Sequence, residues 1–208
     1  MMPSVKSTRS TILLLRAAAF AAEKHANQRR KDRARTPYIN HPLAVARVLA
    51  EEGGVKDSRI LAAALLHDTL EDTDTTLREL ERGFGKRVAS LVAEVTDDKA
   101  LPKQVRKQLQ IDHAPYKSRA AEIIKVADKI CNLRDLQSSP PNYWTVERRR
   151  TYKQWASKVI AALPMPNHQI RRVFGREYTS TNSVKLSASS SASSKCRPSR
   201  RRQSALIG

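Results

Sequence analysis

Apolar residues recur at three- and four-residue spacing along most of this chain, and this pattern limits the folds that it can adopt. The spacing predicts helices over residues 8–27, 118–136 and 146–163, each with one buried face. Residues 61–67 are so rich in alanine and leucine that a helix there should be central and buried. No segment of useful length alternates apolar and polar residues as a half-buried strand does. The pattern therefore predicts an all-α fold.

Helix ends are marked by residues with special backbone preferences. Pro42 is suited to the first turn of a helix, which should stop before Gly53 and its neighbouring glycine. Asp57 or Ser58 can cap the alanine-rich helix that follows. Further along, we expect Thr73 and Asp74 to cap a short helix.

The chain divides at Pro164. Residues 1–163 are expected to form one domain, although the polar stretch 101–112 has no evident place in its core. Residues 164–208 are rich in serine and basic residues, and such a composition buries too little apolar surface to offset the entropy of ordering. The sequence thus predicts a basic tail without ordered structure.

Net charge is the strongest compositional signal, since 39 Lys and Arg against 20 Asp and Glu give +19. The tail contributes +8 of this, so residues 1–163 retain +11. This balance favours polyanionic partners: nucleic acid, an anionic membrane or a multiply phosphorylated small molecule. The apolar runs are far shorter than the roughly 20 residues of a membrane helix, and the two cysteines form no secreted disulfide framework. We therefore expect a cytoplasmic protein that does not enter a membrane.

The sequence LLHDTLED at 65–72 contains the first candidate site. His67 and Asp68 stand at the end of the apolar helix, where burying a charged aspartate without a partner is costly. A bound cation supplies such a partner, because a neutral imidazole and a neighbouring carboxylate can reach one metal ion. A His-Asp pair alone is more often a solvated helix end, so its interpretation depends on the rest of the chain.

Two further segments support a metal site. His41, in YINHP at 38–42, stands beside a proline whose restricted backbone makes it a well-positioned ligand. Asp128 lies beside the apolar stripe of 123–136, where an unpaired carboxylate would be costly, and Asn132 shares its face. Two histidines and two aspartates form a mixed nitrogen and oxygen set. This set suits one Mn²⁺ or another borderline divalent ion better than a thiolate-binding metal.

Two acids follow the His-Asp pair at close range. Glu71 and Asp72 each come four residues after one member of the pair, so they lie within a few ångströms of it whether the helix continues or turns. A metal there lowers the pKa of bound water and polarises a phosphoryl oxygen. The two acids are then candidates for general acid–base catalysis or for orienting the attacking water. The alternative is that they cap the next helix together with Thr73 and Asp74.

These residues resemble the H…HD…D signature of the HD phosphohydrolase superfamily. Longer strings are more specific to the hydrolase domain of the RelA/SpoT family: RRKD at 29–32, TPYINHP at 36–42, AALLHDTLEDTDTT at 63–76, EVTDDK at 94–99 and KVADKICNLRDL at 125–136. In particular, they resemble the small metazoan SpoT homologue that consists of this domain alone. The likeness spans about residues 8–163. It implies an HD-domain helical bundle around a single metal site.

The resemblance also implies an Mn²⁺-dependent 3′-pyrophosphohydrolase that cleaves guanosine tetra- and pentaphosphate to GDP or GTP and pyrophosphate. It makes His41, His67, Asp68 and Asp128 the metal ligands, and Glu71 and Asp72 the catalytic acids. The substrate-binding positions that it implies are Arg30, Lys31, Lys103, Asn132, Arg148 and Tyr152. Animal members of the family are also associated with removal of the 2′-phosphate of NADPH, which is a second candidate substrate.

One departure from the family pattern precedes TPYINHP. The family often has glycine where this chain has Arg-Ala-Arg at 33–35, and a residue with a Cβ resists a positive φ angle. We therefore expect this loop to differ.

Two alternatives belong to other functional classes. A basic protein that binds nucleic acid is supported by charge alone, since the chain has no zinc finger or RNA-binding signature. A non-catalytic HD module that binds a nucleotide is the other. All six expected metal and acid positions are filled, and this favours the enzyme.

Overall fold

The computed structural model describes residues 5–164 and 167–189. Within these ranges the chain is helical, with no strand and one isolated bridge between Arg29 and Pro37, so the predicted all-α class is confirmed. The elements are α1 (Val5–Lys24), α2 (Asn40–Arg47), η1 (Val48–Glu52), α3 (Ser58–Leu66), α4 (Thr69–Asp72), α5 (Leu77–Phe84), α6 (Lys86–Val95), α7 (Lys103–Asp112), η2 (Ala114–Tyr116), α8 (Arg119–Ser138), α9 (Val146–Ala162) and α10 (His168–Ser189).

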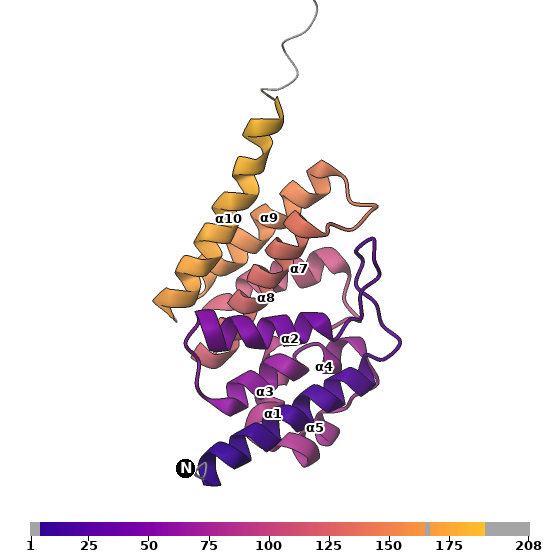
Figure 1. Ribbon diagram of the computed structural model, residues 1–208, viewed down its shortest axis with the longest axis vertical. Coiled ribbons are helices and arrows are strands. Elements are labelled where there is room, and N and C mark those ends of the chain that lie inside the picture. Colours follow the sequence, from indigo (N-terminus) through magenta and orange to yellow (C-terminus); the bar gives the residue numbers. More distant parts are fainter. Residues whose placement is uncertain (1–4, 165–166, 190–208) are drawn as a thin grey trace, which may run out of the picture.

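The helices α3 and α8 form the centre of the bundle. Residues 62–66 of α3 are all buried, because small and branched apolar side chains cover its circumference. α1, α2 and α6 pack around α3, and α8 packs against α2, α6, α9 and α10. Figure 1 shows α1 and α2 beside α3. α3 and α8 also contact each other. Residues at the C-terminal end of α3 are thereby brought close to the middle of α8.

Capping agrees with the sequence at one helix and differs at another. Asp57 accepts a hydrogen bond from the backbone N–H of Arg59 and caps α3. The prediction that Thr73 and Asp74 cap the next helix is wrong. α5 is capped instead by Thr76, in a capping box with Glu79 that pairs two backbone N–H groups with side chains.

The helix α2 begins before the proline that marks it in the sequence. It starts at Asn40, so Pro42 occupies a first-turn position where no intrahelical N–H bond is needed. The helix then widens into the π-turn η1, which ends at Gly53. A Cβ at Gly53 would lie 2.8 Å from the backbone oxygen of Leu49 and 3.3 Å from Ile170 Cδ1. Glycine is therefore required where α10 packs.

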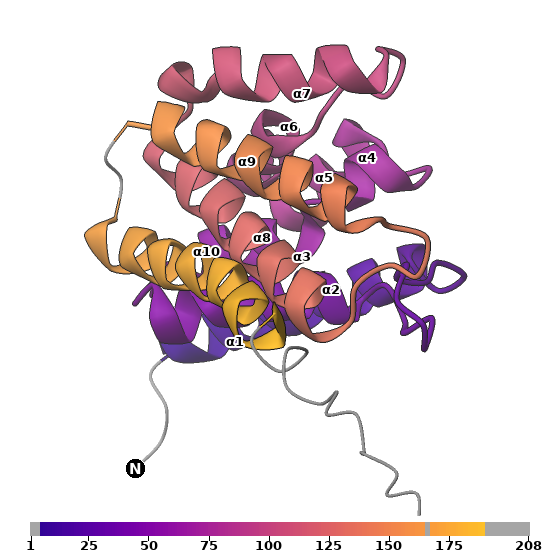
Figure 2. The same ribbon diagram turned by 90° about the horizontal axis from the view of Figure 1, so that it is seen from above.

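The prediction of a tail without ordered structure after residue 163 is wrong for residues 168–189, which form α10. Ile170, Val173 and Phe174 are buried, and α10 runs beside α8 (Figure 2). These three residues form one apolar face, which the serine-rich and basic composition of residues 164–208 as a whole conceals. Glu177 accepts from Arg134 of α8 at 2.8 Å and ties the helix down. Residues 190–208 of the predicted tail lie outside the described ranges.

The polar stretch 101–112 finds its place as α7, a surface helix. None of its residues is buried. It packs along α9 on the outside of the bundle (Figure 2), and Trp155 Nε1 donates to the backbone oxygen of Lys107 at 2.9 Å. In the described part of the chain, no helix combines the length and apolar content needed to cross a membrane.

Candidate active site

The four predicted metal ligands converge on one cavity of about 190 Å³. His41 is the second residue of α2, Asp128 lies in α8, and His67 and Asp68 directly follow α3. His67 Nε2 lies 3.2 Å from Asp68 Oδ1. His41 Nε2 lies 3.2 Å from Asp128 Oδ1 and 3.9 Å from Asp68 Oδ2. Ligand atoms of His41, His67 and Asp128 all fall within 4.8 Å of one another.

The hydrogen bonding of His67 leaves one ring nitrogen for a cation. Nδ1 lies 2.8 Å from the backbone oxygen of Ala64, which can only accept, so Nδ1 donates its proton there and Nε2 is the nitrogen that can bind a cation once it has lost its own proton. Nε2 is buried and faces Asp68 Oδ1 at 3.2 Å. Burial lowers the pKa of His67, but Asp68 and Asp128 outweigh this effect and raise it to about 9. A negative pocket in which an imidazole nitrogen lies beside a carboxylate oxygen fits a divalent cation, which would take the place of the Nε2 proton.

Asp128 is held by neighbours on several sides. Lys129 Nζ donates to Oδ2 at 2.8 Å, and Asn132 Nδ2 donates to Oδ1 at 2.6 Å. Burial raises the pKa of Asp128, but Lys129 and His41 overcome it and hold the pKa well below its usual value. Lys129 is itself buried, with its ammonium group 4.7 Å from the centroid of the Trp155 ring. Asp128 is therefore ionised and oriented.

Asp72 and Asp68 share one tyrosine. The Tyr38 hydroxyl lies 2.7 Å from Asp68 Oδ2 and 3.2 Å from Asp72 Oδ2. Burial and the two carboxylates raise the pKa of Tyr38, so its hydroxyl keeps its proton and serves as a donor. Lys99 pairs with the other oxygen of Asp72. Because Thr76 caps α5, Asp72 is not the cap of that helix. Asp72 instead forms part of the cavity wall.

Glu71 lines another wall of the cavity. Its Oε1 lies 3.4 Å from Arg106 Nη1, and its Oε2 accepts from the backbone N–H of Asp97 at 3.2 Å. Burial raises the pKa of Glu71, and the charges of Asp97 and Asp68 add to this, while the hydrogen bond from Asp97 opposes it. A carboxyl group with a raised pKa exchanges its proton closer to neutral pH.

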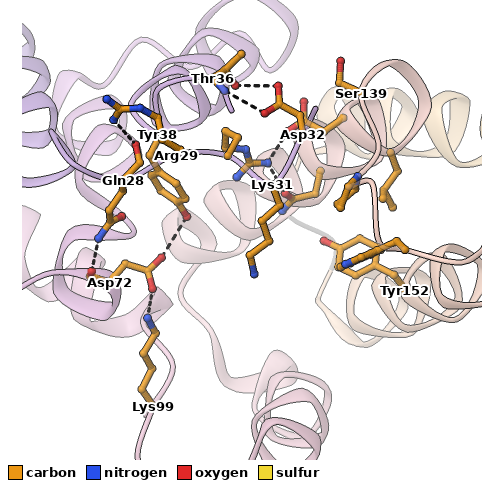
Figure 3. Close-up of a pocket in the computed structure, with 16 residues that line it drawn as sticks. Gln28, Arg29, Lys31, Asp32, Thr36, Tyr38, Asp72, Lys99, Ser139 and Tyr152 are labelled. Carbon is orange, nitrogen blue, oxygen red and sulfur yellow. Dashed lines mark hydrogen bonds and ion pairs between the residues drawn. The ribbon is translucent and has the colours of Figure 1, made fainter. Parts of the chain in front are cut away.

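A cleft of about 680 Å³ (Figure 3) shares part of its lining with the cavity of the predicted metal ligands. Arg30 and Asn132 line both spaces. Four of the six predicted substrate-binding residues line the cleft: Arg30, Lys31, Asn132 and Tyr152. The Lys31 side chain projects into the space between Asp72 and Tyr152 (Figure 3). The fold therefore brings most of the predicted substrate-binding residues together in one cleft.

Arg30 links the cleft to the predicted metal ligands through a chain of hydrogen bonds. Its Nη2 donates to Asp135 and, at 3.2 Å, to Asn132 Oδ1. Asn132 in turn donates to Asp128. The guanidinium group also lies over the Tyr38 ring, 5.5 Å from its centroid. A substrate that contacts Arg30 would thus be coupled to the side chains around Asp128.

Lys103 and Arg148 do not line the cleft itself. Lys103 is the first residue of α7, and the Arg148 guanidinium lies 4.6 Å from the centroid of Trp144, which does line the cleft. Burial lowers the pKa of Lys103, followed by repulsion from Arg148 and Lys31. Lys103 is therefore near enough to Arg148 and to Lys31 of the cleft wall to be repelled by both.

The loop that carries Arg30 and Lys31 contains backbone strain. Arg35 has φ 50°, and among the described residues it is the one non-glycine with positive φ. This lies in the segment where the sequence departs from the glycine-containing family pattern. The loop is closed by Asp32, which accepts from Thr36 N and Oγ1 at 3.0 and 3.1 Å.

Sequence reasoning missed four side chains that support the site: Tyr38, Lys99, Arg106 and Lys129. Three of them lie inside the strings TPYINHP, EVTDDK and KVADKICNLRDL, so motif membership was an available signal. Arg106 lies in a polar helix, where nothing distinguishes it from a solvated arginine.

This chain is similar in sequence and in structure to known proteins. A family model described as HD domain matches residues 17–163. The guanosine-3′,5′-bis(diphosphate) 3′-pyrophosphohydrolase MESH1 of Xenopus tropicalis is 58% identical over 151 residues, covering 73% of this chain and 84% of that protein. The Homo sapiens protein of that name is 55% identical over 157 residues, covering 76% and 88%. A solved structure described as a metazoan orthologue of SpoT that hydrolyses ppGpp and plays a role in starvation responses aligns with a TM-score of 0.79. Its identity is 43%, over 86% of this chain and 97% of that chain.

Proposed function

Because this chain belongs to the HD-domain family, and within it to the metazoan SpoT homologues, we propose that it is a guanosine-3′,5′-bis(diphosphate) 3′-pyrophosphohydrolase. The reaction hydrolyses the 3′-phosphoester of ppGpp and yields GDP and pyrophosphate. The observation that carries the proposal is the convergence of two imidazoles and two carboxylates beside a cleft with basic walls.

In this proposal, His41, His67, Asp68 and Asp128 hold one divalent cation, Mn²⁺. This assignment is supported by the mixed nitrogen and oxygen donors, by the buried His67 Nε2 beside Asp68 Oδ1 and by the ionised Asp128. When bound, the cation supplies Lewis-acid activation of the phosphoester and neutralisation of developing negative charge.

The two acids have separate parts in the proposal. Glu71 takes a proton from the attacking water, because its raised pKa suits proton exchange and Arg106 fixes its carboxylate at the cavity wall. Asp72, held by Tyr38 and Lys99, orients the reacting groups.

The basic residues of the cleft bind the phosphates of the nucleotide. Arg30 and Lys31 act at its centre, and Lys103 and Arg148 act at its rim. The repulsion between Lys103 and the neighbouring cations decreases when an anion binds between them. Asn132 contacts the ribose side of the substrate, and Tyr152 forms part of the wall.

The central test is pyrophosphate release from ppGpp by the purified chain with Mn²⁺. Asp68→Ala is expected to abolish both hydrolysis and bound manganese measured by elemental analysis. Asp74→Ala is the matched control, because Asp74 is an exposed aspartate paired with Lys24 outside the site. Hydrolysis that survives EDTA or Asp68→Ala would eliminate the metal mechanism.

A second variant separates catalysis from metal binding. Glu71→Gln should retain manganese and lose most turnover, since the amide cannot accept the proton. Wild-type turnover in this variant would show that Glu71 is not the general base.

The same preparation distinguishes the alternatives. Side-by-side kinetics on ppGpp and NADPH ranks the two substrates. A nucleic-acid-binding protein would instead show binding with a steep salt dependence that survives Asp68→Ala.

A further inference from the structure

His25, which directly follows α1, is a buried histidine outside the set of proposed ligands and catalysts. It is 2% exposed, and the centroid of its ring lies 4.8 Å from that of the Tyr38 ring. Burying an imidazole is costly unless its polar atoms find partners. Its Nδ1 lies 2.8 Å from Gln28 Oε1, while Nε2 has no hydrogen-bond partner among the described residues. The polar contact of His25 is therefore with Gln28.

Gln28 connects His25 to two residues of the active site. Its side-chain Nε2 donates to the backbone oxygen of Asp72, the last residue of α4. The last carbonyl groups of a helix have no partner within the helix, so Gln28 supplies one from outside. The backbone oxygen of Gln28 accepts from the N–H of Tyr38 at 3.1 Å. Figure 3 shows the side chains of Gln28 and Tyr38 both reaching Asp72.

The direction of these hydrogen bonds determines where His25 carries a proton. A backbone oxygen can only accept, so the Gln28 side chain turns its NH₂ group to Asp72 and its oxygen to His25. The amide oxygen can also only accept, so His25 Nδ1 is the donor. The chain of hydrogen bonds thus runs from His25 Nδ1–H through the Gln28 amide to the Asp72 carbonyl. Without a donor at Nδ1, nothing on the His25 side holds the amide in this orientation.

We propose that His25 is a positioning residue for Asp72 and Tyr38. It fixes Asp72 through Gln28, and it fixes Tyr38 through the contact between their rings. The Tyr38 hydroxyl lies 2.7 Å from Asp68 Oδ2 and 3.2 Å from Asp72 Oδ2, so both constraints meet at Asp72. His25 lines neither the cavity nor the cleft, so it acts through these neighbours. The consequence for turnover rests on the proposed hydrolase function, in which Asp72 orients the reacting groups.

Loss of the His25 donor should lower kcat and leave KM almost unchanged. A displacement of about 1 Å in a group that orients the reaction can cost up to roughly 100-fold in rate. The cations that bind the phosphates stand on other hydrogen bonds, since Arg30 is held by Asn132 and Asp135. Substrate binding therefore does not depend on the chain from His25 to Asp72.

Two variants separate hydrogen bonding from packing. His25→Asn places an amide N–H near the position of Nδ1 but leaves space beside Tyr38, whereas His25→Phe fills the space and has no donor. The kcat for ppGpp should fall about tenfold or more in His25→Phe and about threefold or less in His25→Asn, with KM and bound manganese little changed in both. A role in packing alone predicts the opposite order. Val88→Ala, a buried substitution outside the site, is the control for lost stability and should keep the kcat of the unmodified protein.

Gln28→Met tests the same chain at a partly buried position, so it decides the matter even when a variant of His25 fails to fold. Methionine keeps the length of the side chain and removes both polar atoms. Its kcat should fall as much as that of His25→Phe. The double variant should be no slower than either single variant, because both substitutions interrupt one chain of hydrogen bonds.

NMR of the ring nitrogens tests the hydrogen bonds without any assay of activity. In the full chain labelled with ¹⁵N-histidine, with diamagnetic Mg²⁺ in place of Mn²⁺, His25 Nδ1 should carry a proton whose signal shifts in Gln28→Met. The signal is assigned by its absence in His25→Phe.

Four outcomes overturn the proposal: an unprotonated Nδ1, a kcat in His25→Phe equal to or above that in His25→Asn, an unchanged kcat in Gln28→Met, or losses that multiply in the double variant. Absence of ppGpp hydrolysis by the unmodified chain refutes the hydrolase function instead, and the NMR measurement still decides the chain of hydrogen bonds.

Discussion

Replacing Lys129 by methionine should destabilise the protein far more than the same change at Lys107, although both ammonium groups lie over one indole ring. Lys129 Nζ is 4.7 Å and Lys107 Nζ is 4.6 Å from the centroid of Trp155. Of the two, Lys129 alone pairs with a carboxylate in the described part of the chain, at 2.8 Å from Asp128 Oδ2. The two variants therefore separate a cation–π contact from a buried ion pair.

The expected magnitudes follow from these surroundings. Removing one partner of a buried ion pair costs roughly 3–5 kcal/mol. Asp128 keeps its hydrogen bond from Asn132, so we take the lower end, about 3 kcal/mol. The cation–π contact contributes about 1 kcal/mol. Lys129→Met should thus cost about 4 kcal/mol and Lys107→Met about 1 kcal/mol. With roughly 2–4 °C per kcal/mol for a chain of this size, their Tm values should differ by about 6–12 °C.

A divalent cation should reduce this difference. In metal-free protein the Lys129 ammonium group neutralises the charge of Asp128. A divalent cation bound to Asp128 neutralises the same charge. Ammonium and cation compete for one carboxylate, so Mn²⁺ should stabilise Lys129→Met more than it stabilises the unmodified protein. Unfolding curves of the three proteins in EDTA and in saturating Mn²⁺ measure both effects.

Two results would refute this reasoning. Equal stability losses in Lys129→Met and Lys107→Met would show that the pair with Asp128 contributes nothing to folding. A Lys129→Met loss of the same size with and without Mn²⁺ would show that the cation does not bind at Asp128.

Further predictions concern single positions. Tyr38→Phe removes the hydroxyl hydrogen bond to Asp68 and should slow ppGpp hydrolysis about tenfold or more, because a hydrogen bond to a charged group contributes roughly 1.5–3 kcal/mol; an unchanged rate contradicts this. Arg35→Gly should stabilise the fold by about 0.5–1 kcal/mol in urea unfolding, since glycine adopts φ 50° without strain; a loss of stability contradicts this. Gly53→Ala should lower Tm, because its Cβ would lie 2.8 Å from a backbone oxygen, whereas Gly83→Ala, whose Cβ meets nothing within 4 Å, should not; equal Tm values count against the clash.

Much of the fold was predictable because helices depend on nearby residues. The periodicity of residues 118–136 matches α8, and Asp57 caps α3 as its sequence position indicates. The cap of α5 was harder to place, since several threonines and aspartates precede it and only Thr76 has a glutamate at the right spacing and a helix to follow. The apolar face of α10 was overlooked for a related reason. Its few apolar residues become significant once α8 provides a surface to cover them.

The sequence by itself determined the residues of the candidate site, because the side-chain types needed for a cation stand beside apolar helical stripes where unpaired charge is costly. Their roles as ligands and catalysts stay predictions. Only the tertiary structure decided which side chains support them. Tyr38 reaches Asp68 across 30 residues, and Arg106 reaches Glu71 across 35. No periodicity encodes such pairs, because the distance between residues on different helices is set by how those helices pack together, and hydrogen bonds and ion pairs act only over a few ångströms.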